Sequence, residues 1–204
     1  MFVSNGHSNR VDVWDIRTPS HPVALDSIPM APHGGGVNFG SLQGNGGLLA
    51  VATENDNKVE HGNVVFFNTC DHREPVAVLS VGALPDMVTF APDGKCVLVA
   101  NEGEPDDDCA VDPEGSITII PTIGPHKFVP ATADFTAFNS LKADLVAAGV
   151  RIFGPRATVA QDLEPEHIAV SKDSSAAHVT LQENNAIAIV NVLTATQGSQ
   201  FGRK

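Results

Sequence analysis

The stretch LPDMVTFAPDGKCVLVANEGE, residues 84–104, contains two short runs of strand-forming residues on either side of a Pro-Asp-Gly sequence. These three residues are typical of a tight turn, because they supply a fixed φ, a side-chain acceptor and access to positive φ. The stretch therefore predicts a β-hairpin. Two acids flank it: Asp86 where the first strand begins, and Glu102 where the second strand ends.

The same pattern occurs at two other places in the chain. A shift of 80 residues places the hairpin over LEPEHIAVSKDSSAAHVTLQENN (163–185), and a shift of 48 residues places it over GVNFGSLQGNGGLLAVATE (36–54). Each copy continues into a third, almost continuously apolar run, as expected for strands buried between packed sheets. The third runs are residues 62–69, 115–122 and 185–192, and residues 2–16 match the end of a further unit.

Repeats of about 45 residues with three or four strands are typical of β-propeller blades. The segments PVALDSI (22–28) and PVAVLSV (75–81) match each other and supply an outer fourth strand. We expect an all-β fold, a partial β-propeller of about three and a half blades in one domain. Because propellers close with about 4–8 blades, we also expect the chain to be a fragment of a longer protein. The expected blade units are residues 1–30, 31–82, 83–122 and 163–193.

Residues 123–162 interrupt the period and predict an insertion. Within them, apolar residues recur at helical spacing, and Gly149 is a plausible stop. We expect one amphipathic helix that lies on the propeller, either as a packed extension or with a role of its own. The apolar positions are Phe135, Phe138, Leu141, Leu145 and Val146.

The composition describes an acidic globular protein with 42% hydrophobic and 18% charged residues. A net charge of −12, with only 12 scattered basic residues, disfavours nucleic acid and is compatible with divalent cations. No apolar run is long enough to predict a membrane span, and the first residues lack the features of a signal peptide.

The three cysteines, Cys70, Cys96 and Cys109, are widely spaced. They show no CxxC pattern, so the sequence predicts neither a zinc knuckle nor a redox pair. One disulfide is possible on composition, and its pairing stays open.

Five long motifs are distinctive in the chain: VGALPDMVTFAPDGKCVLVANEGEP (81–105), DPEGSITII (112–120), TADFTAFN (132–139), AGVRIFGP (148–155) and ATVAQDLEPEHIAVS (157–171). They closely resemble the choice-of-anchor I domain family, and the resemblance runs from about residue 2 to residue 193. Members take their name from mesenchyme-specific cell-surface glycoproteins linked to biomineral deposition, and bacterial members are often labelled alkaline phosphatase-like. The resemblance implies a secreted or surface-attached propeller with seven blades, and no settled activity.

Oxygen-bearing side chains recur where the inner strands of the expected blades begin and end. In a propeller, equivalent residues of successive blades form a ring, and antiparallel pairing brings both strand ends to one rim. About six such side chains at one mouth favour Ca²⁺ over zinc, because zinc prefers His and Cys. Alternatively, the acids only solvate strand ends. The expected metal ligands are Asp86, Glu102, Glu166, Glu54, Glu183 and Asn38, with Gln182 as the direct equivalent of Glu102.

Two other regions contain candidate binding residues. The loop 101–115 is acidic and lacks EF-hand spacing, so it is either a solvated loop or a surface calcium site. His33 and His167 are minor rim candidates, and the glycine-rich segment 32–38 lacks the features of a phosphate-binding P-loop. No catalytic nucleophile stands out, and catalytic residues are unassigned. The loop acids considered as ligands are Asp106, Asp107, Asp108 and Asp112.

These features predict an extracellular or cell-surface binding module, serving adhesion or mineral-associated binding with Ca²⁺. Its ligand could be mineral, a phosphate ester or a cell-surface partner. The first alternative is a metal-dependent phosphoesterase, for which Lys58 is the only base near the expected rim. The second alternative is a truncated, non-functional fragment.

Overall fold

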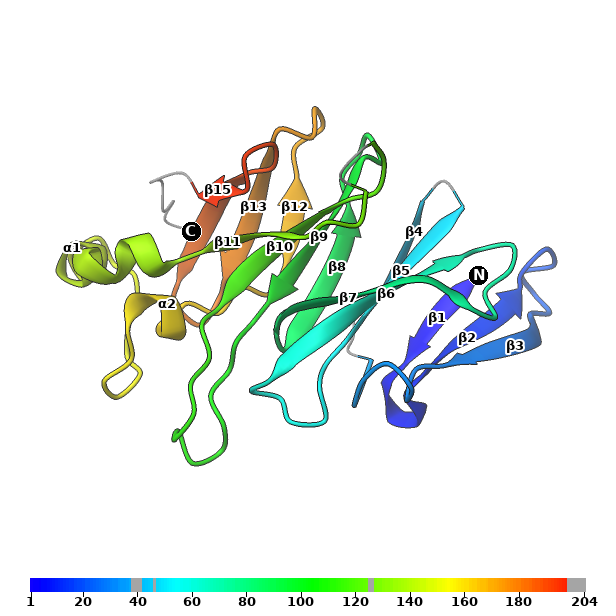
Figure 1. Cartoon of the computed structure of the whole chain (residues 1–204), viewed down its shortest axis with the longest axis horizontal. Coiled ribbons are helices and arrows are strands. Elements are labelled where there is room, and N and C mark those ends of the chain that lie inside the picture. Colours follow the sequence, from blue (N-terminus) through cyan, green and yellow to red (C-terminus); the bar gives the residue numbers. More distant parts are fainter. Residues whose placement is uncertain (38–41, 46, 125–126, 198–204) are drawn as a thin grey trace.

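The computed structural model describes residues 1–37, 42–45, 47–124 and 127–197 (Figure 1). Within them, the strands form four small antiparallel sheets, and strand order in each sheet follows the order in the chain. The first sheet contains β1 (Phe2–Asn5), β2 (Arg10–Asp15) and β3 (Val23–Pro29). The second contains β4 (Leu42–Asn45), β5 (Leu48–Thr53), β6 (His61–Asn68) and β7 (Pro75–Ala83).

The third sheet contains β8 (Pro85–Phe90), β9 (Cys96–Asn101), β10 (Ser116–Pro121) and β11 (Ala131–Asp134). The fourth contains β12 (Ile168–Val170), β13 (Ala176–Leu181), β14 (Ala186–Asn191) and β15 (Thr196–Gln197). Figure 1 shows the sheets side by side in chain order. Strand β8 contacts both β4 and β12, so the first strands of these three sheets are neighbours. This arrangement is consistent with consecutive blades of a β-propeller.

The hairpin β8–β9 forms as its sequence predicts. Val88 pairs with Val99, and the turn places Gly94 at φ +70° while the Asp93 carboxylate accepts a hydrogen bond from Lys95 N. At the other end of the hairpin, Glu102 N donates to Leu84 O at 2.9 Å. The beginning of β8 and the end of β9 therefore lie at the same edge of the sheet.

Three hydrophobic clusters fill the spaces between neighbouring sheets. The second and third strands contribute most of the fully buried residues, including Phe66 and Leu98. The largest cluster joins the third and fourth sheets, with Ile117 on one side and Val179 on the other. Burial of these apolar surfaces stabilises the stack of sheets and holds the third sheet against the fourth.

The region expected to be one helix contains four shorter elements. Strand β11 pairs with β10 and completes the third sheet, so this sheet extends beyond the expected boundary at residue 122. The Asp134 carboxylate accepts from Thr136 N and ends the strand, and η2 (Thr136–Leu141), α1 (Lys142–Ala147) and α2 (Val159–Asp162) follow. The single-helix prediction was wrong, because apolar spacing over 135–146 cannot separate a 3₁₀ turn from an α-helix.

The apolar positions of this region are only partly buried. Phe135, Phe138 and Leu145 enter the core, whereas Leu141 and Val146 keep 41% and 50% of their surface exposed. Helix α1 ends at the expected glycine: Gly149 has φ +96°, its N–H donates to Val146 O, and the next N–H donates to Leu145 O. This is a Schellman motif, in which glycine adopts the left-handed conformation without strain.

The three cysteines are free thiols. Cys70 and Cys109 are exposed, and burial raises the pKa of the Cys96 thiol to about 11. Among the described residues, no helix combines the length and the apolar character needed to cross a lipid bilayer.

Candidate metal centre

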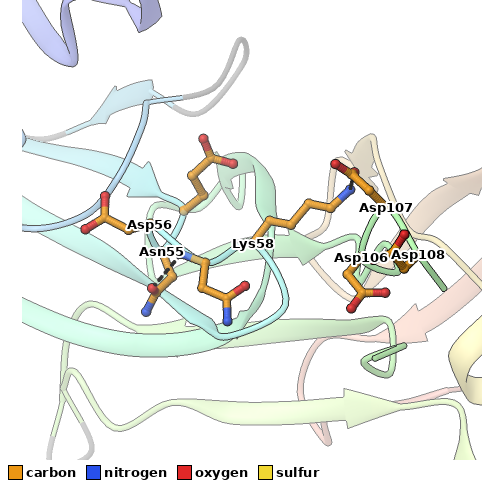
Figure 2. A pocket seen from close by; sticks show the side chains of 8 residues that line it. Asn55, Asp56, Lys58, Asp106, Asp107 and Asp108 are labelled. Carbon is orange, nitrogen blue, oxygen red and sulfur yellow. Dashed lines mark hydrogen bonds and ion pairs between the residues drawn. The ribbon is translucent and has the colours of Figure 1, made fainter. Parts of the chain in front are cut away.

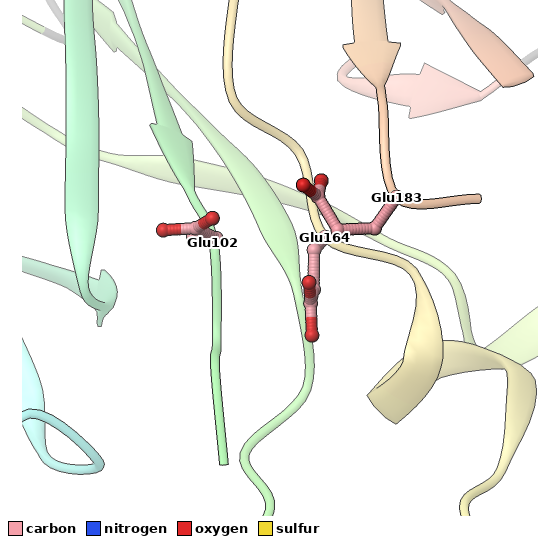
Figure 3. Close-up of side chains that lie close together, drawn as sticks. All are labelled: Glu102, Glu164 and Glu183. Atoms are coloured by element: carbon pink, nitrogen blue, oxygen red, sulfur yellow. The ribbon is translucent and has the colours of Figure 1, made fainter. Parts of the chain in front are cut away.

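Three glutamates meet where the third sheet packs against the fourth. Figure 3 shows Glu102 at the end of β9, Glu164 on the segment that leads to β12, and Glu183 on the chain that leaves β13. One carboxylate oxygen from each lies within 4.8 Å of the others. In the described part of the chain, this is the only group of three or more His, Cys, Asp or Glu side chains with this geometry. We call it the glutamate triad.

The side chain of Asn184 fixes the two fourth-sheet members of the triad. Its amide oxygen accepts from Glu164 N at 3.2 Å, and its amide nitrogen donates to Arg151 O at 2.9 Å and to Asp162 O at 2.6 Å. Asn184 is fully buried, and it directly follows Glu183. The segment that carries Glu164 is therefore tied to the turn that carries Glu183 by hydrogen bonds shielded from water.

A glycine permits the close approach of the two sheets at the triad. A Cβ placed on Gly115 would lie 2.0 Å from Leu163 O and 3.0 Å from Glu102 O. These are the backbones that carry the two sides of the triad, so any side chain at residue 115 would force Glu164 away from Glu102. The sequence requires glycine here for space, since the φ of Gly115 is outside the left-handed region.

Glu102 is the most buried member of the triad, with 9% of its surface exposed. Its carboxylate makes no hydrogen bond or ion pair with any described residue. Burial, reinforced by the charges of Glu104, Asp86, Glu166 and Glu164, raises its pKa to about 8. A buried carboxylate without a partner is costly, because the charged form loses its hydration and gains nothing in return.

The other two triad members are half-buried. Burial, with the charges of Glu104, Glu183, Asp162 and Asp112, raises the pKa of Glu164 to about 7. One carboxylate oxygen of Glu183 is buried and has no hydrogen-bond partner in the described structure. The triad thus contains Glu102, whose carboxylate has no hydrogen-bond partner among the described residues, and Glu183, which has one buried oxygen without a partner.

Further carboxylates border the triad. The register of the hairpin shifts between Pro85 and Met87, and Asp86 is the extra residue on β8 at this point. Burial raises the pKa of Asp86, with the charge of Glu104 acting in the same direction and His167 opposing it. The pKa of Glu166 is also raised by burial and by nearby acids, although its carboxylate accepts from the Gln182 amide.

The structure separates the sequence-predicted ligands into three groups. Glu102 and Glu183 belong to the triad, while Asp86 and Glu166 border it. Glu54 follows β5 and lies apart, in a surface hollow of about 550 Å³. Asn38 is outside the described residues.

The sequence pattern did not identify Glu164. In the repeat alignment its equivalent in the third sheet is Leu84, so no acid recurs at this position. The triad also uses Glu183, and Gln182 is the equivalent of Glu102. The candidate site is therefore a junction between two neighbouring sheets, built from non-equivalent positions. The only sequence signal for Glu164 was the short acidic sequence Leu163-Glu-Pro-Glu-His167 before β12.

The acidic loop 101–115 contributes to the surface hollow and forms no second group with ligand geometry. Figure 2 shows Lys58 extending from the β5–β6 loop to Asp107, at 3.6 Å, and its Nζ also lies 3.5 Å from the Glu104 carboxylate. The Asp106 carboxylate accepts from two backbone N–H groups within its own loop. The hollow is lined by Glu54, Asn55, Asp56, Asn57, Lys58 and Asp106–Asp108.

The histidines considered for the rim have other contacts. The His33 ring packs edge-on against Phe67 at 6.1 Å between centroids, and its carbonyl accepts from Thr53 and Asn63. His167 is paired with Glu166 at 3.7 Å and keeps 66% of its side chain exposed. Asp112 is half-buried, and burial raises its pKa. None of these residues joins the triad.

The fold and the site define an all-β repeat protein whose successive sheets enclose a carboxylate cluster at one junction. The chain belongs to the choice-of-anchor I domain family, since the sequence model of that family matches residues 1–200. The family indicates a surface-associated module with a cell-surface or extracellular role. A search among curated proteins finds no match.

Solved structures share the fold at low sequence identity. Hydrazine synthase of Kuenenia stuttgartiensis matches with a TM-score of 0.59 at 15% identity, over 94% of this chain and 49% of that chain. A 6-phosphogluconolactonase candidate from Bacteroides uniformis matches with a TM-score of 0.58 at 15% identity, over 97% and 49%. KlAtg21, in complex with the coiled-coil of AgAtg16, matches with a TM-score of 0.57 at 15% identity, over 95% and 50%. The chain thus spans about half the length of these structures.

Proposed function

We propose that the chain is part of a surface-associated β-propeller that serves adhesion and binds one Ca²⁺ at the glutamate triad. The observation that carries this proposal is Glu102, a buried carboxylate without a protein partner that faces two other carboxylates. A divalent cation would supply the missing partner for all three. This assigns the cation to Glu102, Glu164 and Glu183, with Asp86 and Glu166 outside the direct ligand set.

The spacing and the donor set suit calcium. Ca²⁺ binds six to eight oxygens at about 2.3–2.6 Å, so two oxygens on one ion lie at most about 5 Å apart. The triad oxygens meet this condition, since all lie within 4.8 Å of one another. Zinc is disfavoured, because the triad contains no His or Cys ligand.

The surroundings favour binding over phosphoester hydrolysis. A phosphoesterase needs positive charge to stabilise the developing charge on the phosphoryl oxygens. The basic side chains near the site already have partners: Lys58 pairs with Glu104 and Asp107, His167 is paired with Glu166, and Arg151 Nη2 donates to Gln182 O. The carboxylates around the triad would repel a phosphate ester that approached the cation.

Calorimetric titration of the metal-free protein with Ca²⁺ tests the proposal. We expect one ion per chain with a Kd of about 0.1–1 mM, which is typical of extracellular calcium modules. The variant Glu102→Gln should bind at least about tenfold more weakly, because it loses a charged ligand. The control Glu74→Gln changes an exposed acid on another loop and should bind normally. Equal affinity in the two variants, or no binding to the wild-type protein, would overturn the calcium assignment.

A parallel assay addresses the enzymatic alternative. Hydrolysis of p-nitrophenyl phosphate should be undetectable with and without Ca²⁺. Turnover that requires Ca²⁺ and disappears in Glu102→Gln would instead establish a phosphoesterase.

A further inference from the structure

The charge around the triad restricts what could bind to its cation. The triad carboxylates already outweigh the charge of one Ca²⁺, and Asp86, Glu104 and Glu166 add further negative charge close by. Among the described residues, three basic groups lie near them and are fewer than the acids: Lys58 is paired with Glu104, His167 is paired with Glu166, and Arg151 Nη2 donates to Gln182 O. An anionic ligand on the cation would therefore face a net negative surrounding, which disfavours phosphate and carboxylate groups.

The triad leaves part of the coordination sphere of Ca²⁺ to a ligand from solution. With one oxygen from each glutamate, the ion has three protein ligands, whereas it takes six to eight. One Glu183 oxygen is buried, but Glu164 is only half-buried, so a ligand from solution can approach on the Glu164 side. Neutral oxygens, from water or from hydroxyl groups, can fill these positions without adding charge.

Asp86 provides an additional feature that a hydroxyl ligand would satisfy. Its carboxylate accepts no hydrogen bond from the described residues, and Asp86 lies at the same end of the β8–β9 hairpin as Glu102, where the pairing of β8 is irregular. A hydroxyl group bound to a cation is a strengthened donor, and a charged acceptor makes the stronger kind of hydrogen bond. Phosphate, which is ionised near neutral pH, would offer few protons to this acceptor.

From these observations we infer that the calcium-loaded triad binds a neutral carbohydrate, with two adjacent hydroxyl oxygens on the cation and Asp86 accepting a hydroxyl proton. This inference rests on the proposed calcium site. If the protein serves adhesion, the ligand that it recognises is then a neutral glycan. It assigns Asp86 to the ligand, whereas the sequence pattern had placed this residue on the metal.

The test measures binding of three monosaccharide glycosides to the protein by saturation-transfer NMR. Methyl α-D-mannopyranoside, methyl β-D-galactopyranoside and methyl α-L-fucopyranoside present adjacent hydroxyl pairs in different orientations. We expect saturable binding of at least one at millimolar concentration with Ca²⁺, and its loss when EDTA is added. Inorganic phosphate is titrated in parallel as the anionic probe and should not bind to the calcium-loaded protein.

The variant Asp86→Ala separates a ligand contact from a metal contact. We expect its sugar affinity to fall about tenfold, as for the loss of a charged hydrogen bond, while its calcium affinity changes by less than about threefold. The control Asp107→Ala removes an acid whose side chain is 99% exposed and should change neither affinity.

The outcomes distinguish the two proposals. Absence of calcium binding in calorimetry overturns the proposed function itself. Calcium binding without any sugar binding, sugar binding that persists in EDTA, or tighter binding of phosphate than of sugar overturns the carbohydrate inference and leaves the calcium site standing. Unchanged sugar binding in Asp86→Ala overturns the role of that residue.

Discussion

In the absence of a cation, Glu102 should make the protein less stable as the pH rises. Its pKa is about 8 in the folded protein, against an ordinary value of 4.5. Between these values the folded protein holds a proton that the unfolded chain has lost, so the free energy of unfolding falls with increasing pH. The decrease is about 1.4 kcal/mol per pH unit from this one group, and about 5 kcal/mol across the whole window. Glu164, with a pKa of about 7, acts in the same direction.

The substitution Glu102→Gln isolates this contribution, because glutamine has the shape of the protonated acid and does not titrate. The pH dependence of the variant should be less steep by about 1.4 kcal/mol per unit between about pH 5 and pH 8. If the two proteins are matched at acid pH, the variant should be more stable than the wild type by about 4 kcal/mol near pH 8. Asp173 has a lowered pKa of about 2, so its opposite effect is confined to pH values below this window.

The assay is urea unfolding followed by far-UV circular dichroism, at several pH values in EDTA. Glu74→Gln serves as the matched control, since it makes the same chemical change at an exposed acid. Ca²⁺ at a hundred times the wild-type Kd should stabilise the wild type by about 2.7 kcal/mol. The same concentration should stabilise Glu102→Gln by at most about 1.4 kcal/mol, because that variant binds at least about tenfold more weakly. The reasoning is refuted if the wild type and Glu102→Gln show the same slope, or if stability in EDTA rises with pH through this range.

Three further predictions concern the supports of the site. Gly115→Ala should weaken calcium binding at least about tenfold and lower stability by about 2 kcal/mol, because the added Cβ would clash with Leu163 O. Gly47→Ala is the control: its φ of +87° makes the substitution destabilising, but no atom lies within 4 Å of the added Cβ, so calcium binding should be unchanged. Equal binding by both variants in calorimetry would contradict the packing argument. Asn184→Ala should lower the free energy of urea unfolding by about 3 kcal/mol, because buried donors and acceptors lose their partners; a loss under about 1 kcal/mol would contradict this role. Amide exchange of Glu164, Glu166 and His167 should slow on addition of Ca²⁺, and unchanged exchange would argue against Glu164 as a ligand.

The fold was predictable because its information is repeated. Each sheet independently shows a strand, a turn and a second strand, and equivalent residues such as Val99 and Val179 enter the same hydrophobic cores or their neighbours. The region 131–162 occurs only once, so no second copy constrained its interpretation. The apolar spacing correctly predicted that Phe135, Phe138 and Leu145 are buried. It could not show that a strand and a 3₁₀ turn precede the short helix.

Repetition also explains why the candidate site was only half predicted. Comparing the repeat units identifies only residues that recur at the same position in every unit, such as those at the ends of equivalent strands. A junction between two sheets instead brings the end of one unit against the beginning of the next, so the residues that meet there occupy different positions in their units. Glu102 comes from the first kind of position, whereas Glu164 lies opposite it across the junction and has a leucine as its equivalent.

Glu54 provides the internal comparison. It occupies the same position as Glu102, and its backbone pairs with Gly36 as the end of β9 pairs with the start of β8. Glu54 nevertheless lines an open surface hollow, together with Lys58. The difference is the opposing segment: only at the junction of the third and fourth sheets do Gly115 and Asn184 bring a second and a third carboxylate against the strand end. The repeated hairpin therefore places an acid at the end of its second strand in each of these two sheets. Whether that acid is exposed or enclosed depends on the neighbouring segments, which differ between the sheets. Replacing Glu54 by Gln should accordingly leave calcium binding unchanged, which the same calorimetric titration can verify. A loss of calcium binding in that variant would instead support the ring of equivalent residues.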